Sequence, residues 1–159
     1  MKQKLSYLIA TFFYSGKAPF APGTIGSLAT LPLAFVLAYY FGLTGIICGV
    51  IISFVLGLAS VSQVLKTSKH DPSYVVIDEV AGQLFSFVLI ADSLQYDGRA
   101  GFLYLLGFML FRLFDITKPQ PAQWADKKVR NALGVMLDDV FAGIYTAIIL
   151  YFINLWINV

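Results

Sequence analysis

Five carboxylate side chains stand beside long apolar stretches of this sequence, where ionised groups are uncommon: Asp78, Glu79, Asp115, Asp138 and Asp139. An unpaired carboxylate beside hydrocarbon is costly, so a cation is expected near them. No histidine or cysteine accompanies these residues, and ligation by oxygen alone suits Mg²⁺, Mn²⁺ or Ca²⁺ rather than zinc. The residue types therefore predict a carboxylate site for a hard divalent cation.

A loop rich in glycine and proline could supply phosphate-binding groups. Lys17 and Thr24 belong to this loop, which leads into a helix, and a helix N-terminus attracts anions through its free N–H groups and its dipole. The loop could equally be an ordinary helix entry, capped by Thr24 or Ser27. Its chemistry alone does not separate these two interpretations.

A second set of cationic groups follows an apolar segment. Arg112, Asp115 and Lys118 are spaced at i, i+3 and i+6, so they share one face of a helix that persists to Pro119. This spacing fits a structural ladder of ion pairs as well as a binding site. Carboxylates that hold a metal ion beside cationic groups are, however, the usual equipment for phosphoryl transfer. We therefore expect a phosphate site next to the metal site.

The elements that must position these groups are strongly apolar. Hydrophobic residues make up 58% of the 159-residue chain and charged residues 13%, which is unusual for a soluble globular protein. Because backbone groups in lipid have no partner outside the chain, the apolar segments are expected to be helices. The sequence predicts one domain over 1–159, an all-α integral membrane bundle with a short N-terminal helix at 3–14 and five apolar helices: 25–41, 43–65, 80–91, 100–111 and 140–157.

Not all of these segments are long enough to cross a bilayer. The third and fourth have only 12 uncharged residues each, fewer than the ~17 that a helix needs to cross a bilayer. They are expected to cross only if their charged ends lie inside the bundle. The hinge at 39–44 is short and uncharged, so the first two helices should form an antiparallel hairpin.

The distribution of basic residues predicts an orientation. With five spans, residues 1–24, 66–79 and 112–139 lie on one side of the membrane and contain ten of the eleven lysines and arginines. Because basic residues are retained in the cytoplasm, this side is expected to be cytoplasmic. The candidate site residues lie in the same three segments, so an active site is expected at the cytoplasmic helix ends.

Several other classes of function fit the sequence less well. The net charge of +2 is too small to indicate nucleic acid, and the single cysteine, Cys48, excludes an intrachain disulfide and a cysteine metal cluster. A small transporter or channel would distribute polar residues along its spans, whereas the charges here gather at one end. A structural membrane subunit would leave the carboxylates without a role. No pattern indicates an oligomeric state.

Four blocks of residues occur in an order that is similar to one known family. They are Gly16-x-x-Pro19-x-Ala21-Pro22-Gly23-Thr24-x-Gly26-Ser27, Asp71-Pro72-x-x-x-Val76-x-Asp78-Glu79-x-x-Gly82, Phe111-Arg112-x-Phe114-Asp115-x-x-Lys118-Pro119-x-Pro121 and Gly134-x-Met136-x-Asp138-Asp139-x-x-Ala142-Gly143. These blocks resemble those of the phosphatidylglycerophosphatase A family. The chain departs from the family at Asn131-Ala132, where a pair of glycines is usual.

The resemblance implies a multi-pass enzyme of the bacterial inner membrane. It would remove the terminal phosphate of phosphatidylglycerophosphate with Mg²⁺, giving phosphatidylglycerol, and Asp78 or Glu79 would deprotonate the attacking water. The residues expected to be catalytic are Asp78, Glu79, Asp115 and Asp138. The metal ligands are expected to be the same four residues and Asp139, and the phosphate ligands are expected to be Lys17, Thr24, Arg112 and Lys118.

Overall fold

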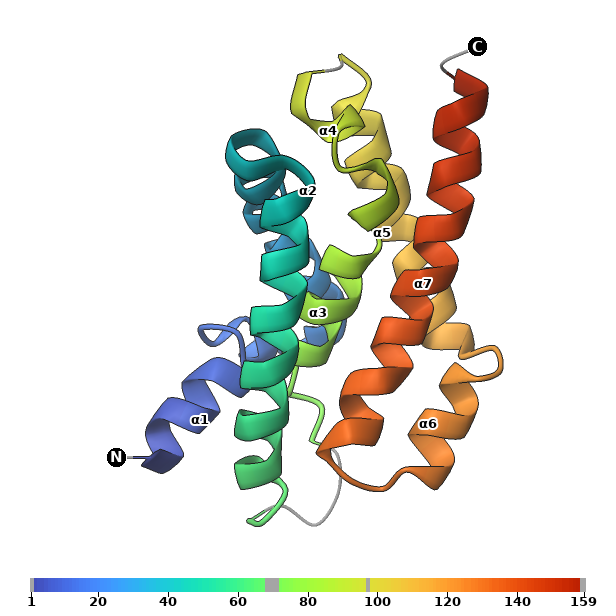
Figure 1. Cartoon of the computed structure of the whole chain (residues 1–159). Helices are drawn as coiled ribbons and strands as arrows, with labels where there is room; N and C mark the ends of the chain where they lie inside the picture. The colour runs from blue at the N-terminus through green and yellow to red at the C-terminus, as the bar shows by residue number, and fades with distance from the viewer. Residues whose placement is uncertain (1, 68–71, 97, 158–159) are drawn as a thin grey trace.

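The computed structural model describes residues 2–67, 72–96 and 98–157, and its regular elements over these residues are all helices (Figure 1). This confirms the predicted all-α class. Asp71 of the second block lies outside the described residues. The α-helices are α1 (Lys2–Ala10), α2 (Pro22–Val64), α3 (Ile77–Phe85), α4 (Ser93–Tyr96), α5 (Ala100–Thr117), α6 (Ala122–Lys128) and α7 (Ala132–Ile157), with single 3-10 turns at η1 (Ser15–Lys17) and η2 (Val88–Ile90).

Helix α2 is a hairpin of two arms, residues 22–41 and 43–64, that run antiparallel (Figure 1). The turn is made at Gly42, whose φ of 57° and ψ of −142° interrupt the helix and whose positive φ favours glycine. The arms pack closely, because a Cβ atom at Gly45 would lie 2.5 Å from the carbonyl oxygen of Leu37. The hairpin predicted from the short uncharged hinge is therefore confirmed.

The predicted helix over 80–91 is not continuous. Helix α3 begins at Ile77 and ends at Phe85, and the 3-10 turn η2 follows. This segment packs mainly against α2 and α7, and Val80, Ala81 and Leu84 are buried in the core. The burial of α3 gives it protein contacts in place of lipid, so it does not need the length of a spanning helix.

Three of the helices are long and apolar enough to cross a membrane: α2, α5 and α7. They contain the other four predicted apolar segments. Their outward surfaces expose large apolar side chains, among them Ile51, Val55, Phe102 and Leu105, as expected of a membrane protein. Helix α7 begins at Ala132, well before the predicted start near residue 140.

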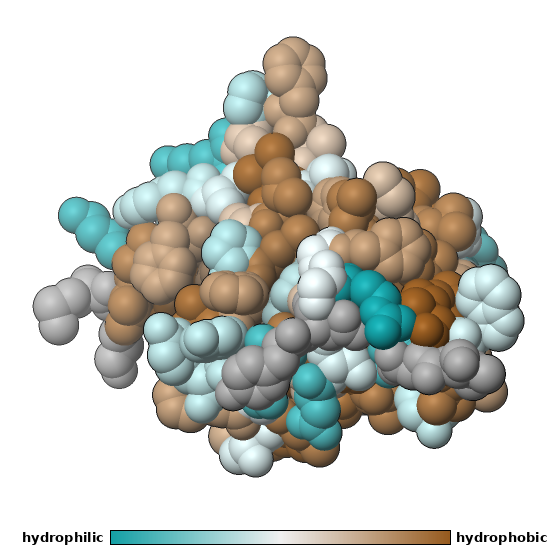
Figure 2. Space-filling view, turned by 90° about the horizontal axis from the view of Figure 1, so that it is seen from above, coloured by the Kyte–Doolittle hydropathy of each residue, from teal (hydrophilic) through white to brown (hydrophobic). Residues whose placement is uncertain are grey.

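The two ends of the bundle differ. The end that we call the site end contains α1, α6, the start of α3 and the end of α5, whereas the opposite hairpin end contains the turn of α2, α4 and the last turns of α7 (Figure 1). Figure 2 looks onto the hairpin end, where polar side chains are scattered among mainly apolar ones. Polar contacts close this end: the Gln95 side chain donates to the Ala38 carbonyl (2.9 Å), and Asn154 donates to Ser93 (2.9 Å).

The N-terminal helix is shorter than predicted. Helix α1 ends at Ala10, and Phe12, Phe13 and Tyr14 all have positive φ angles, between 40° and 69°. The Ala10 carbonyl accepts a hydrogen bond of 2.9 Å from the backbone N–H of Val76. This bond ties the end of α1 to the residues that lead into α3.

Candidate metal and phosphate site

Helix α3 presents Asp78 and Glu79 in its first turn, where the helix dipole favours negative charge. The Asp78 carboxylate accepts a hydrogen bond from the backbone N–H of Glu79 (3.1 Å). Gly23 makes room for the Glu79 side chain, because a Cβ atom at Gly23 would collide with the Glu79 carboxylate. The first turn of α2 and the first turn of α3 therefore meet at Glu79.

Asp139, from α7, completes a cluster of three carboxylates. Asp78, Glu79 and Asp139 each offer an oxygen, and these oxygens lie within 4.8 Å of one another. Two glycines bring α3 and α7 together: a Cβ atom at Gly82 would collide with the Asp139 carbonyl, and one at Gly143 would collide with the Gly82 carbonyl. Both glycines belong to the sequence blocks, but their spacing did not reveal this contact.

Arg112 links the cluster to α5 and α2. Its guanidinium lies 2.6 Å from Asp115 and 3.8 Å from Glu79. It also donates to the hydroxyl of Ser27 (3.2 Å), which in turn donates to the Gly23 carbonyl (2.8 Å). Ser27, considered from the sequence only as a helix cap, therefore helps to hold Arg112 beside the carboxylates.

Lys118 forms a second group of charges next to the first. Its ammonium donates to Asp138 of α7 and to Asp126 of α6, the latter at 2.9 Å. Burial acts to lower the pKa of Lys118, but Asp138 and Asp126 hold it above its usual value. Asp138 also accepts a hydrogen bond from the backbone N–H of Asp139 (3.0 Å). Lys118 thus joins α5, α6 and α7. Its partner Asp126 was not among the site residues predicted from the sequence.

The two remaining phosphate candidates, Lys17 and Thr24, differ in their surroundings. The Lys17 ammonium sits over the rings of Tyr7 and Tyr14, at 5.2 and 5.0 Å from their centroids. It lines a separate pocket that none of the cluster carboxylates lines. Thr24 lies half-buried in the first turn of α2, beside Gly23.

The electrostatics of the cluster fit a bound cation. Burial raises the pKa of the Glu79 carboxyl to about 8, and the negative charges of Asp139 and Asp115 act in the same direction. Glu79 Oε2 and Arg112 Nε are buried without a hydrogen-bond partner among the described residues. Buried polar atoms are normally paired, so these atoms indicate a site built for polar ligands.

The oxygen donors also match a particular kind of ion. Three carboxylates supply hard, negatively charged ligands, which suit Mg²⁺ and similar cations. Arg112 is the cation that the structure places against both Glu79 and Asp115, and the pKa of Glu79 stays raised despite this contact. A divalent ion therefore fits the donor set and the charge of the cluster.

Comparison with known proteins points to a single family. The model described as Phosphatidylglycerophosphatase A matches residues 8–154. The chain is similar to phosphatidylglycerophosphatase A of Escherichia coli (33% identity over 150 residues, covering 93% of this chain and 83% of the relative) and of Haemophilus influenzae (35% over 151 residues, covering 94% and 89%). It is also similar to a Bacteroides thetaiotaomicron protein with the provisional name phosphatidylinositol-3-phosphatase (32% over 150 residues, covering 92% and 91%). No solved structure matches.

Proposed function

The chain belongs to the phosphatidylglycerophosphatase A family, and we infer that it hydrolyses the terminal phosphomonoester of phosphatidylglycerophosphate with the help of a divalent metal ion. The products are phosphatidylglycerol and inorganic phosphate, so the chain is a phosphoric monoester hydrolase of phospholipid biosynthesis. The observation that carries the metal-assisted reaction is the cluster of Asp78, Glu79 and Asp139, whose oxygens lie within 4.8 Å of one another.

Asp78, Glu79 and Asp139 would hold the metal ion, which we propose to be Mg²⁺. Such an ion supplies positive charge that polarises a phosphoryl oxygen and makes water a better nucleophile. Asp115 and Asp138 were also predicted to be metal ligands. Each is paired with a cation, Arg112 and Lys118 respectively, so their role as ligands stays a prediction.

The remaining roles belong to the cluster itself and to the cationic residues beside it. We place Asp78 or Glu79 as the acceptor of the proton that the attacking water loses. Arg112 and Lys118 present cationic N–H groups beside the carboxylates, where they can bind the oxygens of the transferred phosphoryl group and stabilise charge in the transition state. Ser27 supports this arrangement by accepting a hydrogen bond from Arg112.

We place the protein in the bacterial inner membrane with its site end in the cytoplasm. The support is the distribution of basic residues, since ten of the eleven lysines and arginines fall in the segments 1–24, 66–79 and 112–139. A lipid substrate carries its phosphate at the membrane surface, and the charged groups of the site lie at helix ends. The lipid phosphate can therefore reach the site at the membrane surface, and the substrate does not need a polar path through the bundle.

A second candidate substrate comes from the Bacteroides relative, whose name refers to a phosphoinositide. Both lipids are phosphomonoesters, so the chemistry of the carboxylate cluster does not distinguish between them. The experiment is phosphate release by purified protein from phosphatidylglycerophosphate, phosphatidylinositol-3-phosphate and phosphatidic acid, each with Mg²⁺ and with EDTA. We expect Mg²⁺-dependent release that is fastest from phosphatidylglycerophosphate. Release that is fastest from the phosphoinositide would transfer the assignment to that lipid, and release that is unaffected by EDTA would contradict the metal-assisted reaction.

A further inference from the structure

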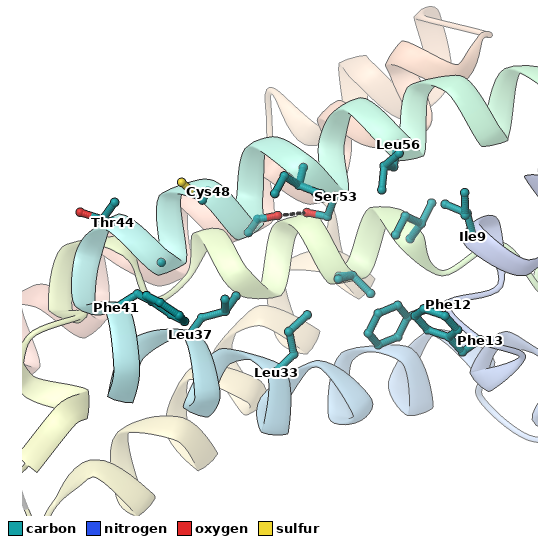
Figure 3. A pocket seen from close by; sticks show the side chains of 15 residues that line it. Ile9, Phe12, Phe13, Leu33, Leu37, Phe41, Thr44, Cys48, Ser53 and Leu56 are labelled. Atoms are coloured by element: carbon teal, nitrogen blue, oxygen red, sulfur yellow. Dashed lines mark hydrogen bonds between the residues drawn. The ribbon is translucent and has the colours of Figure 1, made fainter.

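An apolar groove of about 460 Å³ lies between the two arms of α2 (Figure 3). Side chains of both arms form its walls, including Leu33, Leu37 and Leu56, and Ile77 and Val80 of α3 contribute to its floor. In Figure 3, Ile9, Phe12 and Phe13 lie at one end of the groove and Thr44 lies near the other. The groove is large enough for a small-molecule ligand, and its lining is almost entirely apolar.

The length of the groove matches one leaflet of a membrane. Its lining along the second arm runs from Thr44 to Leu56, which corresponds to about 18 Å at the rise of an α-helix. Half of a bilayer's hydrocarbon core is roughly 15 Å thick. The groove therefore has the dimensions of a slot for a single extended acyl chain.

The lining becomes polar beyond the end of the groove where Ile9, Phe12 and Phe13 lie. Along the same arm, Gln63 and Thr67 line a second pocket of about 500 Å³, together with Lys4 and Lys17 from the N-terminal segment. No acidic side chain lines this pocket among the described residues. Lys17 is held by aromatic rings rather than by a carboxylate, so its positive charge can act on a ligand. The order along the arm, apolar and then basic, is that of an anionic phospholipid.

This surface is separate from the site of hydrolysis. Ile77 and Val80 of α3 face the groove, whereas Glu79, between them in sequence, faces Gly23 and Arg112. Helix α3 therefore lies between the groove and the carboxylate cluster. Phe13 lines the groove and its neighbour Tyr14 lines the basic pocket. Tyr14 has 52% of its surface exposed, and tyrosine is typical of the membrane interface.

We propose that the groove and the basic pocket together bind one anionic phospholipid of the surrounding membrane, as an accessory site. One acyl chain lies between the arms of α2, and the headgroup phosphate contacts Lys4 and Lys17. The occupant is anionic because both charged residues that line the described pocket are lysines. It is a lipid because the apolar groove, which has the length of one leaflet, and the basic pocket follow one another along the second arm of α2.

Cys48 provides a local reporter for this proposal. It is the only cysteine of the chain, it is exposed, and it lines the groove. A bound acyl chain would cover its thiol and slow its reaction with N-ethylmaleimide. Lipid bound at the carboxylate cluster would not, because α3 lies between the two places. The reaction rate is measured in detergent while phosphatidylglycerol, phosphatidylserine or phosphatidylcholine with the same acyl chains is added.

We expect both anionic lipids to slow the modification about tenfold at ~10 times their Kd, at concentrations where phosphatidylcholine has no effect. The variant Lys4→Gln/Lys17→Gln should lose this preference. The variant Lys127→Gln/Lys128→Gln, which makes the same charge change on α6, should keep it. Size-exclusion profiles and melting temperatures compared with the unmodified chain establish that both variants are folded.

Three results would overturn the proposal. Equal protection by phosphatidylcholine would show a groove that accepts any lipid, without a headgroup site. Protection that persists in the Lys4→Gln/Lys17→Gln variant would place the headgroup elsewhere. Protection that appears without lipid and rises with protein concentration would show that a second copy of the chain covers the groove.

Discussion

Negative charge is concentrated around Glu79. Arg112 approaches this carboxylate to 3.8 Å, but it lies closer to Asp115, at 2.6 Å. Asp78 and Asp139 complete the cluster from α3 and α7. Carboxylates held this close repel one another, and burial disfavours their charged forms. In its ionised form the cluster would therefore be destabilising by itself, and the divalent cation that we propose would offset both effects.

The substitution Glu79→Gln tests this site. Glutamine keeps the shape of the side chain but is a neutral and weaker ligand, so we expect phosphate release to fall at least ~10²-fold. We expect Mg²⁺ to raise the melting temperature of the unmodified chain by binding its folded state, and this rise should disappear in the variant. Asp92→Asn, near the hairpin end, is the matched control and should change neither measurement. Normal turnover with an intact Mg²⁺-dependent shift in Glu79→Gln would show that Glu79 is not a ligand.

Lys118 has two possible roles that kinetics can separate. Its ammonium is held by Asp126 and Asp138, and the same group can bind a phosphate oxygen of the substrate. We expect Lys118→Met to raise KM or lower kcat by about tenfold or more, since a hydrogen bond to a charged group contributes about 1.5–3 kcal/mol. The Mg²⁺-dependent shift in melting temperature should remain, because the substitution removes no metal ligand. A lower melting temperature with unchanged kinetics would mean that Lys118 only joins the helices.

At the scale of the elements, the site depends on the close approach of α3 and α7. Gly82→Ala would push a methyl group against the backbone of Asp139, and overpacking of this kind costs about 1–3 kcal/mol. We therefore expect a lower melting temperature and reduced phosphate release, because the separation of the helices also separates Glu79 from Asp139. Gly101→Ala is the control: nothing lies within 4 Å of the added atom, and alanine favours helix by up to ~1 kcal/mol. Equal stability of the two variants would contradict the close contact.

The arrangement of the elements was partly predictable from sequence. The hairpin of α2 follows from local properties, a short uncharged hinge with a glycine, and the residues of the cluster follow from carboxylates placed beside apolar segments. The break after Phe85 could not be foreseen, because burial by neighbouring helices, rather than local pattern, determines the length of α3. Local spacing also does not show which cations pair with which carboxylates. For example, Lys17 was predicted to bind phosphate, but its ammonium lies over the rings of Tyr7 and Tyr14.

At the scale of the whole molecule, charge is confined to places where the bundle ends. Arg112, Asp115, Asp138 and Asp139 are the charged residues within the described membrane-spanning candidates, and all four belong to the site-end halves of α5 and α7. Buried hydroxyl groups elsewhere in the spans, such as those of Thr30 and Thr146, donate to carbonyls of their own helix. A transport pathway would need polar groups along its length, so this distribution favours a reaction at the membrane surface.

The orientation of the bundle can be tested by labelling from one side. In a Cys48→Ser background, a single cysteine is placed at Lys127 in α6, at the site end, or at Gly98, which lies in open space beside the start of α5. The basic residues predict a cytoplasmic site end. We therefore expect a membrane-impermeant maleimide to label Gly98→Cys in intact spheroplasts, and Lys127→Cys only after permeabilisation. The reverse pattern would place the site outside, and labelling of both positions in intact spheroplasts would contradict a bundle that spans the membrane. Phosphate release by the two cysteine variants, measured before labelling, establishes that each is folded as an active enzyme.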